Sequence, residues 1–231
     1  NFLQNLDVVI LSVPLIHFQD LVETQLPMEH LHGKLIVEIC PLSTHPKSIL
    51  LKNLPLDSDI LSTTALFGPS AANKNPWDNA PLLYEKVRVA DKKRCDTFLS
   101  IFSLAHCRLA PMTAEQADNY CASSEFVTYL MGHLLTQRHH ILPPAPVMSR
   151  ESEMLIDVAE AMQSRSFDYL YGLYEFNPAG QEYLQKLKDN LTFLERGLAA
   201  KEAYLIAKKE VRMQERGNLL EECKMLMREV T

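Results

Sequence analysis

Short, continuously apolar segments constrain the fold of the first half of this chain most. The clearest are D-V-V-I-L-S-V-P at residues 7–14 and K-L-I-V-E-I-C at residues 34–40. Such runs are typical of parallel strands that are covered on both faces. Because strands that alternate with helices build an α/β sheet, we expect one over residues 1–112. Its remaining strands are expected at 59–66, 82–89 and 107–112, and its helices at 16–23, 46–54 and 91–106.

Residues 113–231 have the pattern of helices almost throughout. The tetrapeptide T-A-E-Q at 113–116 fits a capping box, which predicts a helix that starts there and runs to about residue 138. An aromatic-rich helix is expected at 167–176, and Pro178 suits the first turn of a long final helix. The predicted fold class is therefore α/β followed by all-α, with the boundary near residue 112.

The final helix carries a leucine stripe. Its members follow one another at steps of three and four residues: Leu184, Leu187, Leu191, Leu194 and Leu198. This spacing places them on one side of a helix. Two hypotheses remain open, since the stripe can face the core of its own chain or form a contact between subunits.

Glycine is scarce and widely spaced, which excludes the common phosphate-binding loops. Only 7 of the 231 residues are glycine, and neither G-x-G-x-x-G nor G-x-x-x-x-G-K occurs. The formal net charge of −6 argues against binding of double-stranded nucleic acid. No apolar run approaches the roughly 18 residues that a membrane-spanning helix needs.

The five cysteines are never spaced C-x-x-C, and their number is odd. We therefore expect reduced thiols in an intracellular or organellar compartment, with Cys40 and Cys121 in the core. His30 and His32 have the spacing of metal ligands but no third ligand nearby, so no metal site is expected. Because the first residue is Asn1, we expect either a removed presequence or an earlier start of the protein.

Six blocks of the sequence resemble the TyrA-type prephenate and arogenate dehydrogenases, most of all the plant-type arogenate dehydrogenases. They lie, in the family's order, at residues 7–14, 54–61, 67–69, 74–79, 84–89 and 166–178. The resemblance implies the later strands of a Rossmann-type NAD(P) domain at 1–112 and an all-helical dimerisation domain at 113–231. The family reaction is hydride transfer from the substrate ring to NAD(P)+ with loss of CO2.

By the same resemblance, this chain departs from the family at its functional positions. The strand at residues 7–14 matches the family's fourth, so the first βαβ unit with its glycine fingerprint has no counterpart here. The family's T-H-P-M-F-G-P reads T-T-A-L-F-G-P at residues 63–69, which puts Thr64 in place of a catalytic histidine. The serine and lysine of D-x-x-S-x-K fall on Pro41 and Ser43, and the histidine of E-H-D falls on Ala117. A hydroxyl does not act as a general base near neutral pH as an imidazole does, so no catalytic residue is expected.

Further site residues are implied only by the resemblance. Ser12 and Pro14 would border the ribose and nicotinamide of the cofactor, although a plain strand end explains them equally well. The substrate pocket would be bordered by Gly68, Pro69, Trp77 and Glu125. For Trp77, packing of a loop aromatic on the sheet is the competing interpretation.

We therefore expect a degenerate family member that is a non-catalytic structural, scaffold or regulatory subunit without a cofactor. Its partners would be proteins, in a homodimer or a larger complex that uses the helical half. The alternative is an active NADP-dependent arogenate or prephenate dehydrogenase whose N-terminal cofactor-binding part is missing from this chain. A third hypothesis is a sensor that binds another small acid. The plant-type blocks imply the plastid stroma, and otherwise the protein would be cytoplasmic.

Overall fold

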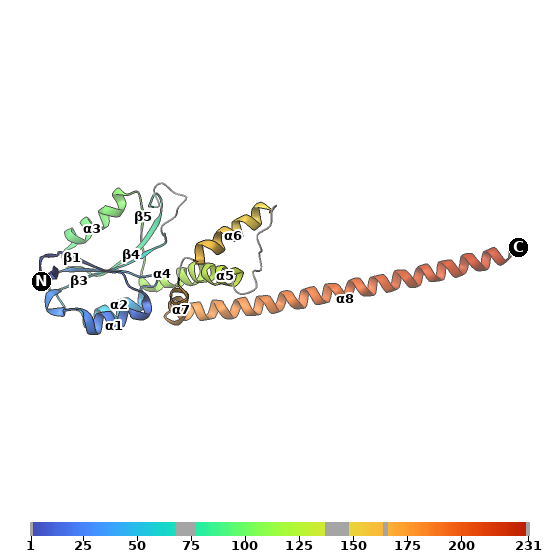
Figure 1. The fold of residues 1–231 in the computed structure, drawn as a ribbon, viewed down its shortest axis with the longest axis horizontal. Coiled ribbons are helices and arrows are strands. Elements are labelled where there is room, and N and C mark those ends of the chain that lie inside the picture. Colours follow the sequence, from blue (N-terminus) through green and yellow to red (C-terminus); the bar gives the residue numbers. More distant parts are fainter. Residues whose placement is uncertain (1, 68–76, 137–147, 164–165, 230–231) are drawn as a thin grey trace. The chain divides into compact units, whose positions relative to one another are not determined.

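The computed structural model describes residues 2–67, 77–136, 148–163 and 166–229 (Figure 1). The chain divides into two compact units, Asn1–Tyr183 and Leu184–Thr231. The first unit holds the sheet and most of the helices. The second is formed by the greater part of one long helix, and each unit is described by itself.

A five-stranded sheet forms the centre of the first unit, and every expected strand is present in it. In spatial order its strands are β1 (Val8–Leu11), β2 (Leu35–Ile39), β3 (Asp59–Ala65), β4 (Pro81–Arg88) and β5 (Arg108–Pro111). Strands β1, β2 and β3 are parallel, whereas β4 runs antiparallel to β3 and β5 parallel to β4. The sequence pattern did not predict the reversal at β4. The physical reason for the reversal is that two parallel neighbouring strands need a long crossover, usually a helix. The sequence has no expected helix between β3 and β4, so β4 returns antiparallel to β3.

Helices cover both faces of this sheet (Figure 1). Helix α1 (Leu15–Asp20), which continues as a π-helical turn (Leu21–Gln25), and α2 (Thr44–Asn53) lie on one face. Helix α3 (Lys92–Leu104) lies on the other face. The core under α3 joins the three residues Leu35, Val37 and Leu61 of the strands to Cys95, Phe98 and Leu99 of the helix. Coverage on both faces explains why β1 is apolar throughout and why Glu38 is the one polar residue of β2.

Helices follow the sheet directly. The first are α4 (Ala114–Cys121), a π-helical turn (Ala122–Phe126) and α5 (Val127–Thr136). They are followed by α6 (Arg150–Gln163) and α7 (Phe167–Glu175). The capping box is confirmed, because the Thr113 hydroxyl accepts from the Gln116 amide at 3.3 Å while the Gln116 side chain accepts from the Thr113 amide at 3.1 Å. The fold class expected from the sequence, α/β followed by all-α, is confirmed.

The change from sheet to helices lies between Pro111 and Ala114. The first compact unit nevertheless continues to Tyr183 and includes α4 to α7. The helices after the sheet therefore belong to the same compact unit as the sheet, and a separate domain from residue 113 stays a prediction.

Helix α8 (Pro178–Glu229) is the longest element of the structure. Three members of its leucine stripe are exposed, Leu191 and Leu194 each 59% and Leu198 73%, whereas Leu184 and Leu187 are half-buried. Whether the stripe faces another part of its own chain or a second subunit stays a prediction. Among the described helices, none combines the length and the apolar character that crossing a membrane requires.

Candidate functional site

The candidate site lies at one edge of the sheet, where the parallel strands β1, β2 and β3 end. Ser12 and Pro14 follow β1, Pro41 and Ser43 follow β2, and Thr64 is near the end of β3. Because parallel strands end at the same edge, residues far apart in the sequence meet there. This edge is where open α/β sheets commonly bind ligands.

Two neighbouring pockets open at this edge. One, of about 280 Å³, has Ser12, Pro14 and Pro41 on one side and Asp168 and Tyr169 of α7 on the other. The structure therefore brings both cofactor positions implied by the resemblance to the border of one pocket.

The second pocket has a volume of about 160 Å³. It is bordered by Pro41 and Thr64 from the sheet edge and by Glu125, Tyr129 and Tyr169 from the helices. Pro41 and Tyr169 border both pockets, so the two are adjacent. Glu125 belongs to the π-helical turn that interrupts the helix between α4 and α5, and such turns are frequent at functional sites.

Thr64 is buried and hydrogen-bonded. Its Oγ1 lies 3.0 Å from the Oγ of Ser43, and the two residues are 1% and 3% exposed. Ala117, which is also buried, borders with them a gap that is too small to hold a water-sized ligand. Three of the four positions that the resemblance assigns to the family's functional residues, Ser43, Thr64 and Ala117, therefore lie around one gap that admits no ligand.

Asp118 closes the N-terminus of α2. Its Oδ1 accepts from the amide of Ser43 at 2.7 Å, and its Oδ2 accepts from the amide of Thr44 at 3.0 Å. Burial raises the pKa of the Asp118 carboxyl, although the two amide hydrogen bonds oppose the shift. Free amides at a helix N-terminus are a common binding site for phosphate. Here the chain's own carboxylate occupies them.

Glu38 is a buried acid that the sequence analysis did not single out. It is 0% exposed within β2, and its Oε2 accepts from the amide of Cys40 at 2.8 Å. Neither Oε1 of Glu38 nor Oγ of its register partner Ser62 has a hydrogen-bond partner among the described residues. Burial raises the pKa of Glu38 to about 8, so its carboxyl is largely protonated at neutral pH. A single acid inside the otherwise apolar run K-L-I-V-E-I-C is the signal that could have found it.

Trp77 lies against α3. Its ring is stacked on Phe102, with centroids 5.5 Å apart and planes at 13°. The ring centroid of Phe67, which borders the second pocket, lies 5.9 Å from the ring centroid of Trp77. Trp77 thus contacts the wall of that pocket through Phe67. Gly68 and Pro69 lie outside the described residues.

His30, His32, Cys40 and Cys121 are the described histidines and cysteines that the sequence analysis singled out. His32 is exposed and pairs with Asp57 at 2.9 Å. The described residues contain no group of three or more side chains that could hold a metal ion. Cys40 and Cys121 are buried as expected, and burial raises the pKa of both thiols, that of Cys121 to about 12. These two thiols are therefore unreactive at neutral pH.

The chain is similar in sequence to known proteins. Residues 136–210 match the family described as TYRAAT1-like, C-terminal domain. Arogenate dehydrogenase 2, chloroplastic, of Arabidopsis thaliana is 34% identical over 189 residues, which are 80% of this chain and 52% of that protein. Arogenate dehydrogenase 1, chloroplastic, of the same plant is 33% identical over 190 residues, which are 80% of this chain and 29% of that protein. The chain belongs to the TyrA-type dehydrogenase family. It spans about half the length of the first of these relatives and less than a third of the second.

Solved structures show the same fold. Prephenate dehydrogenase from A. aeolicus, in complex with hydroxyphenyl propionate and NAD+, superposes with a TM-score of 0.63 at 14% identity over 90% of this chain and 75% of that one. Synechocystis arogenate dehydrogenase superposes with a TM-score of 0.50 at 15% identity over 93% of this chain and 80% of that one. The sheet therefore consists of the later strands of a Rossmann-type domain, as the resemblance implied.

The described residues do not fit the diphosphate of the family's dinucleotide. Helix α1 starts at Leu15, directly after Pro14, with no glycine between strand and helix and no N–H on the proline. The first amides of α2 are taken by Asp118.

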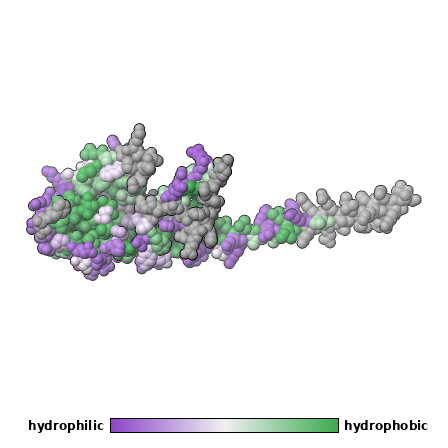
Figure 2. Space-filling model, in the orientation of Figure 1, coloured by the Kyte–Doolittle hydropathy of each residue, from purple (hydrophilic) through white to green (hydrophobic). Residues whose placement is uncertain are grey.

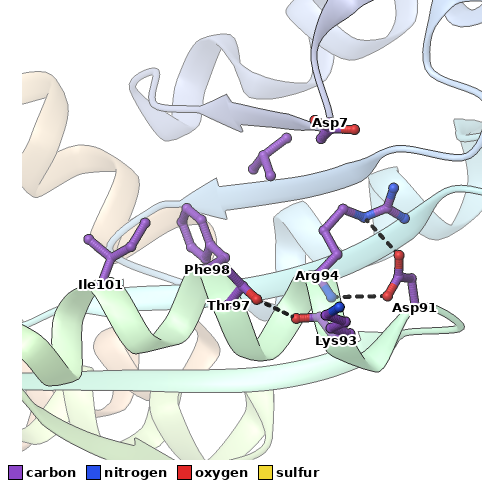
Figure 3. Close-up of a pocket in the computed structure, with 8 residues that line it drawn as sticks. Asp7, Asp91, Lys93, Arg94, Thr97, Phe98 and Ile101 are labelled. Atoms are coloured by element: carbon purple, nitrogen blue, oxygen red, sulfur yellow. Dashed lines mark hydrogen bonds and ion pairs between the residues drawn. The ribbon is translucent and has the colours of Figure 1, made fainter.

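A hollow of about 670 Å³ lies between β1 and α3, on the face of the sheet that α3 covers (Figure 3). Asp7 and Val8 border it from the strand, and Lys93, Phe98 and Ile101 border it from the helix. Within the described residues β1 pairs with β2 alone, so its outer edge is open. Ile10 on that strand is 50% exposed, and Ile101 is 54% exposed.

Proposed function

We propose that this TyrA-type chain is a non-catalytic homologue that serves as a structural or regulatory subunit. The observation that carries the proposal is the buried contact between Thr64 and Ser43. It stands at the position where the resemblance puts the family's catalytic imidazole. A hydroxyl held in this contact does not take the proton that must leave the ring hydroxyl during hydride transfer. Loss of a general base typically lowers a rate by about 10²–10⁴.

The charges of the two pockets support the same proposal. The carboxylic acids among their described residues are Glu125 and Asp168, and no lysine, arginine or histidine is among them. A substrate that loses CO2 carries a carboxylate, which cationic side chains bind and acids repel. The described lining therefore offers no cationic side chain to the carboxylate of the family substrate.

Partners and location are part of the proposal. The exposed apolar stripe of α8 supports binding to another protein chain rather than isolated action. The chloroplastic names of the two Arabidopsis relatives support a place in the plastid stroma.

A direct assay tests the proposal. The purified chain is mixed with arogenate or prephenate and with NADP+ or NAD+, and formation of the reduced cofactor is followed by absorbance. We expect no turnover above the protein-free control. A fluorescence titration with both cofactors is expected to show no binding in the micromolar range. Enzymic turnover or micromolar binding would each contradict the proposal.

The open edge of β1 favours a second candidate, an active NADP-dependent arogenate or prephenate dehydrogenase whose cofactor-binding part is not in this chain. A further parallel strand paired with β1 would cover the half-exposed Ile10. The coding sequence upstream of Asn1 separates the two candidates. A G-x-G-x-x-G after a strand there, together with dehydrogenase activity of the encoded protein, would establish the second and exclude the first.

A further inference from the structure

A cluster of three buried hydroxyls lies beside the carboxyl of Glu38. Ser62 is the register partner of Glu38 on β3, Thr64 lies two residues further along that strand, and Ser43 is the N-cap residue of α2. The neighbours of Glu38 and Ser62 along the two strands pack against α3, so by alternation these polar side chains point to the face that α1 and α2 cover. All four residues are at most 3% exposed.

The hydrogen bonds of this hydroxyl cluster are incomplete. Oγ of Ser43 and Oγ1 of Thr64 lie 3.0 Å apart and form a hydrogen bond. Oγ of Ser62 and Oε1 of Glu38 have no hydrogen-bond partner among the described residues. Burial raises the pKa of the Glu38 carboxyl to about 8, and the hydroxyls of Ser62 and Ser43 lie near enough to oppose the shift by hydrogen bonding to the ionised form. The cluster can therefore respond to the charge of Glu38.

Ionisation changes what this cluster needs, because a buried carboxylate requires donors or a nearby cation. Oε2 of Glu38 accepts from the amide of Cys40 at 2.8 Å, whereas Oε1 has no donor among the described residues. A hydrogen bond from a hydroxyl to a carboxylate is about twice as strong as one between two hydroxyls. We propose that ionisation of Glu38 turns the Ser43 hydroxyl from Thr64 to the carboxylate. Ser62 supplies a second donor to the same group.

Thr64 carries this switch to the candidate site. It borders the closed gap together with Ser43 and Ser62, and it also borders the second pocket. When Ser43 turns to the carboxylate, the Thr64 hydroxyl loses its partner beside that pocket. A hydroxyl supplies one donor and two acceptors, so the wall of the pocket becomes more polar as the acid ionises. The switch goes beyond the proposed function and operates whether or not the chain is catalytic.

The other ionisable groups near this face do not compensate the charge of Glu38. Hydrophilic residues are plentiful at the surface of the first unit, where water solvates them (Figure 2). In the interior, Asp118 binds the first amides of α2, and Lys47 is paired with Glu85 at 2.8 Å. Burial and the charge of Glu38 raise the pKa of the Cys40 thiol, which therefore stays neutral. Within the described part of the chain, Glu38 forms no ion pair. The ionisable groups on the elements packed against this face are Cys40 after β2, His17 and Asp20 of α1, Glu23 of the π-helical turn, His45, Lys47 and Lys52 of α2, Glu85 of β4, and Glu115 and Asp118 of α4.

Carbon-13 NMR of the chain with labelled glutamate carboxyls tests the competition for Ser43, and the signal that is lost in Glu38→Gln identifies Glu38. We expect Ser43→Ala to raise the pKa of Glu38, because the ionised form loses a donor. Thr64→Val is expected to lower it, because Ser43 is then released from its other partner. The matched control Ser48→Ala removes an exposed hydroxyl of α2 and should leave the pKa unchanged. A pKa that stays the same in Ser43→Ala, or that does not fall in Thr64→Val, would overturn the proposal.

Double-mutant cycles measure the contact between Ser43 and Thr64 itself. Urea unfolding of Ser43→Ala, Thr64→Val and the double variant gives their coupling at about pH 6 and about pH 9, on either side of the pKa of Glu38. We expect coupling at the lower pH and its loss at the higher pH. In a Glu38→Gln background the coupling is expected at both, because glutamine stays neutral. Equal coupling at both pH values in the wild-type background, or its loss at high pH in the Glu38→Gln background, would refute the switch. Neither experiment uses enzymic activity, so both results are independent of the proposed function.

Discussion

The hydroxyl of Thr64 lies 3.0 Å from the hydroxyl of Ser43, in a buried contact between the end of β3 and the start of α2. Ser43 is the N-cap residue of α2, yet its side chain makes no capping hydrogen bond. It bonds to Thr64 instead, and Asp118 caps the helix in its place. The two positions that the resemblance assigns to the family's chemistry thus contact each other in the interior of this chain.

Restoring the family's imidazole in Thr64→His is expected to give no dehydrogenase activity. Because Thr64 is 1% exposed, a larger ring overpacks the site, and we expect a loss of about 1–3 kcal/mol in the free energy of unfolding. The measurements are urea unfolding and the assay with NADP+ and arogenate. Thr64→Val, which keeps the shape but removes the hydroxyl, is the control and should cost about 1–3 kcal/mol by leaving Ser43 unpaired. Turnover in the histidine variant would support an enzyme with an incomplete site.

Removal of the acid that caps α2 is expected to be costly. Asp118→Ala leaves the amides of Ser43 and Thr44 without their acceptors, so we expect a loss of about 2–3 kcal/mol in the free energy of unfolding. Asp157→Ala on α6 serves as the control, since that acid is exposed. Urea denaturation of both variants gives the comparison. Equal stability of the two variants would mean that water replaces the cap without loss.

Glu38 makes the stability of the fold depend on pH. Its pKa is about 8 in the folded chain against an ordinary value of 4.5, so between these pH values the folded state binds more protons than the unfolded state. Its contribution is therefore full below about pH 4.5 and is lost as the pH rises to about 8. The loss amounts to at most about 5 kcal/mol.

In Glu38→Gln this loss disappears. The difference in unfolding free energy between the variant and the wild-type chain is expected to grow in favour of the variant from pH 5 to pH 8, as measured by urea unfolding at each pH. Glu151→Gln changes an exposed acid on α6 in the same way and should leave the pH profile unaltered. A flat difference for Glu38→Gln would show that the carboxylate is tolerated in its ionised form.

Gly132 permits the close approach of α5 and α6. A Cβ at this position would lie 2.5 Å from Cγ and 2.6 Å from Cβ of Met162, and both distances are shorter than real contacts. Gly132→Ala is therefore expected to lower the free energy of unfolding by about 1–3 kcal/mol, as measured by urea denaturation. Gly197→Ala is the control, because a Cβ there meets no atom within 4 Å and alanine favours a helix. A neutral Gly132→Ala would show that α6 shifts without loss.

Local signals located the secondary structure well. The run V-V-I-L became β1, Pro178 opens α8, and Thr113 with Gln116 forms the capping box. Each of these depends on neighbours within a few residues along the chain. The direction of β4 was not predicted, because it depends on how a loop returns to the sheet.

The candidate site was predicted only in part for the same reason. The resemblance named Pro41, Ser43 and Thr64, but the contact between Ser43 and Thr64 joins residues that lie on different strands and loops. Trp77 was placed beside the substrate pocket, and the structure shows it stacked on Phe102 of α3. Glu38 was passed over, although it lies in a run that was expected to be covered on both faces, and only the structure shows that no cation among the described residues compensates its burial there.

The amino-acid sequence by itself determined which segments become strands and helices and where one helix is capped, and it showed the resemblance to the TyrA-type family. Only the tertiary structure decided that Thr64 is paired with Ser43, that Glu38 is buried as an acid, and that three leucines of the α8 stripe are exposed. The physical reason is that periodicity tells which side chains share a face. Burial, pairing and pKa depend on what covers that face, and the covering elements come from distant parts of the chain.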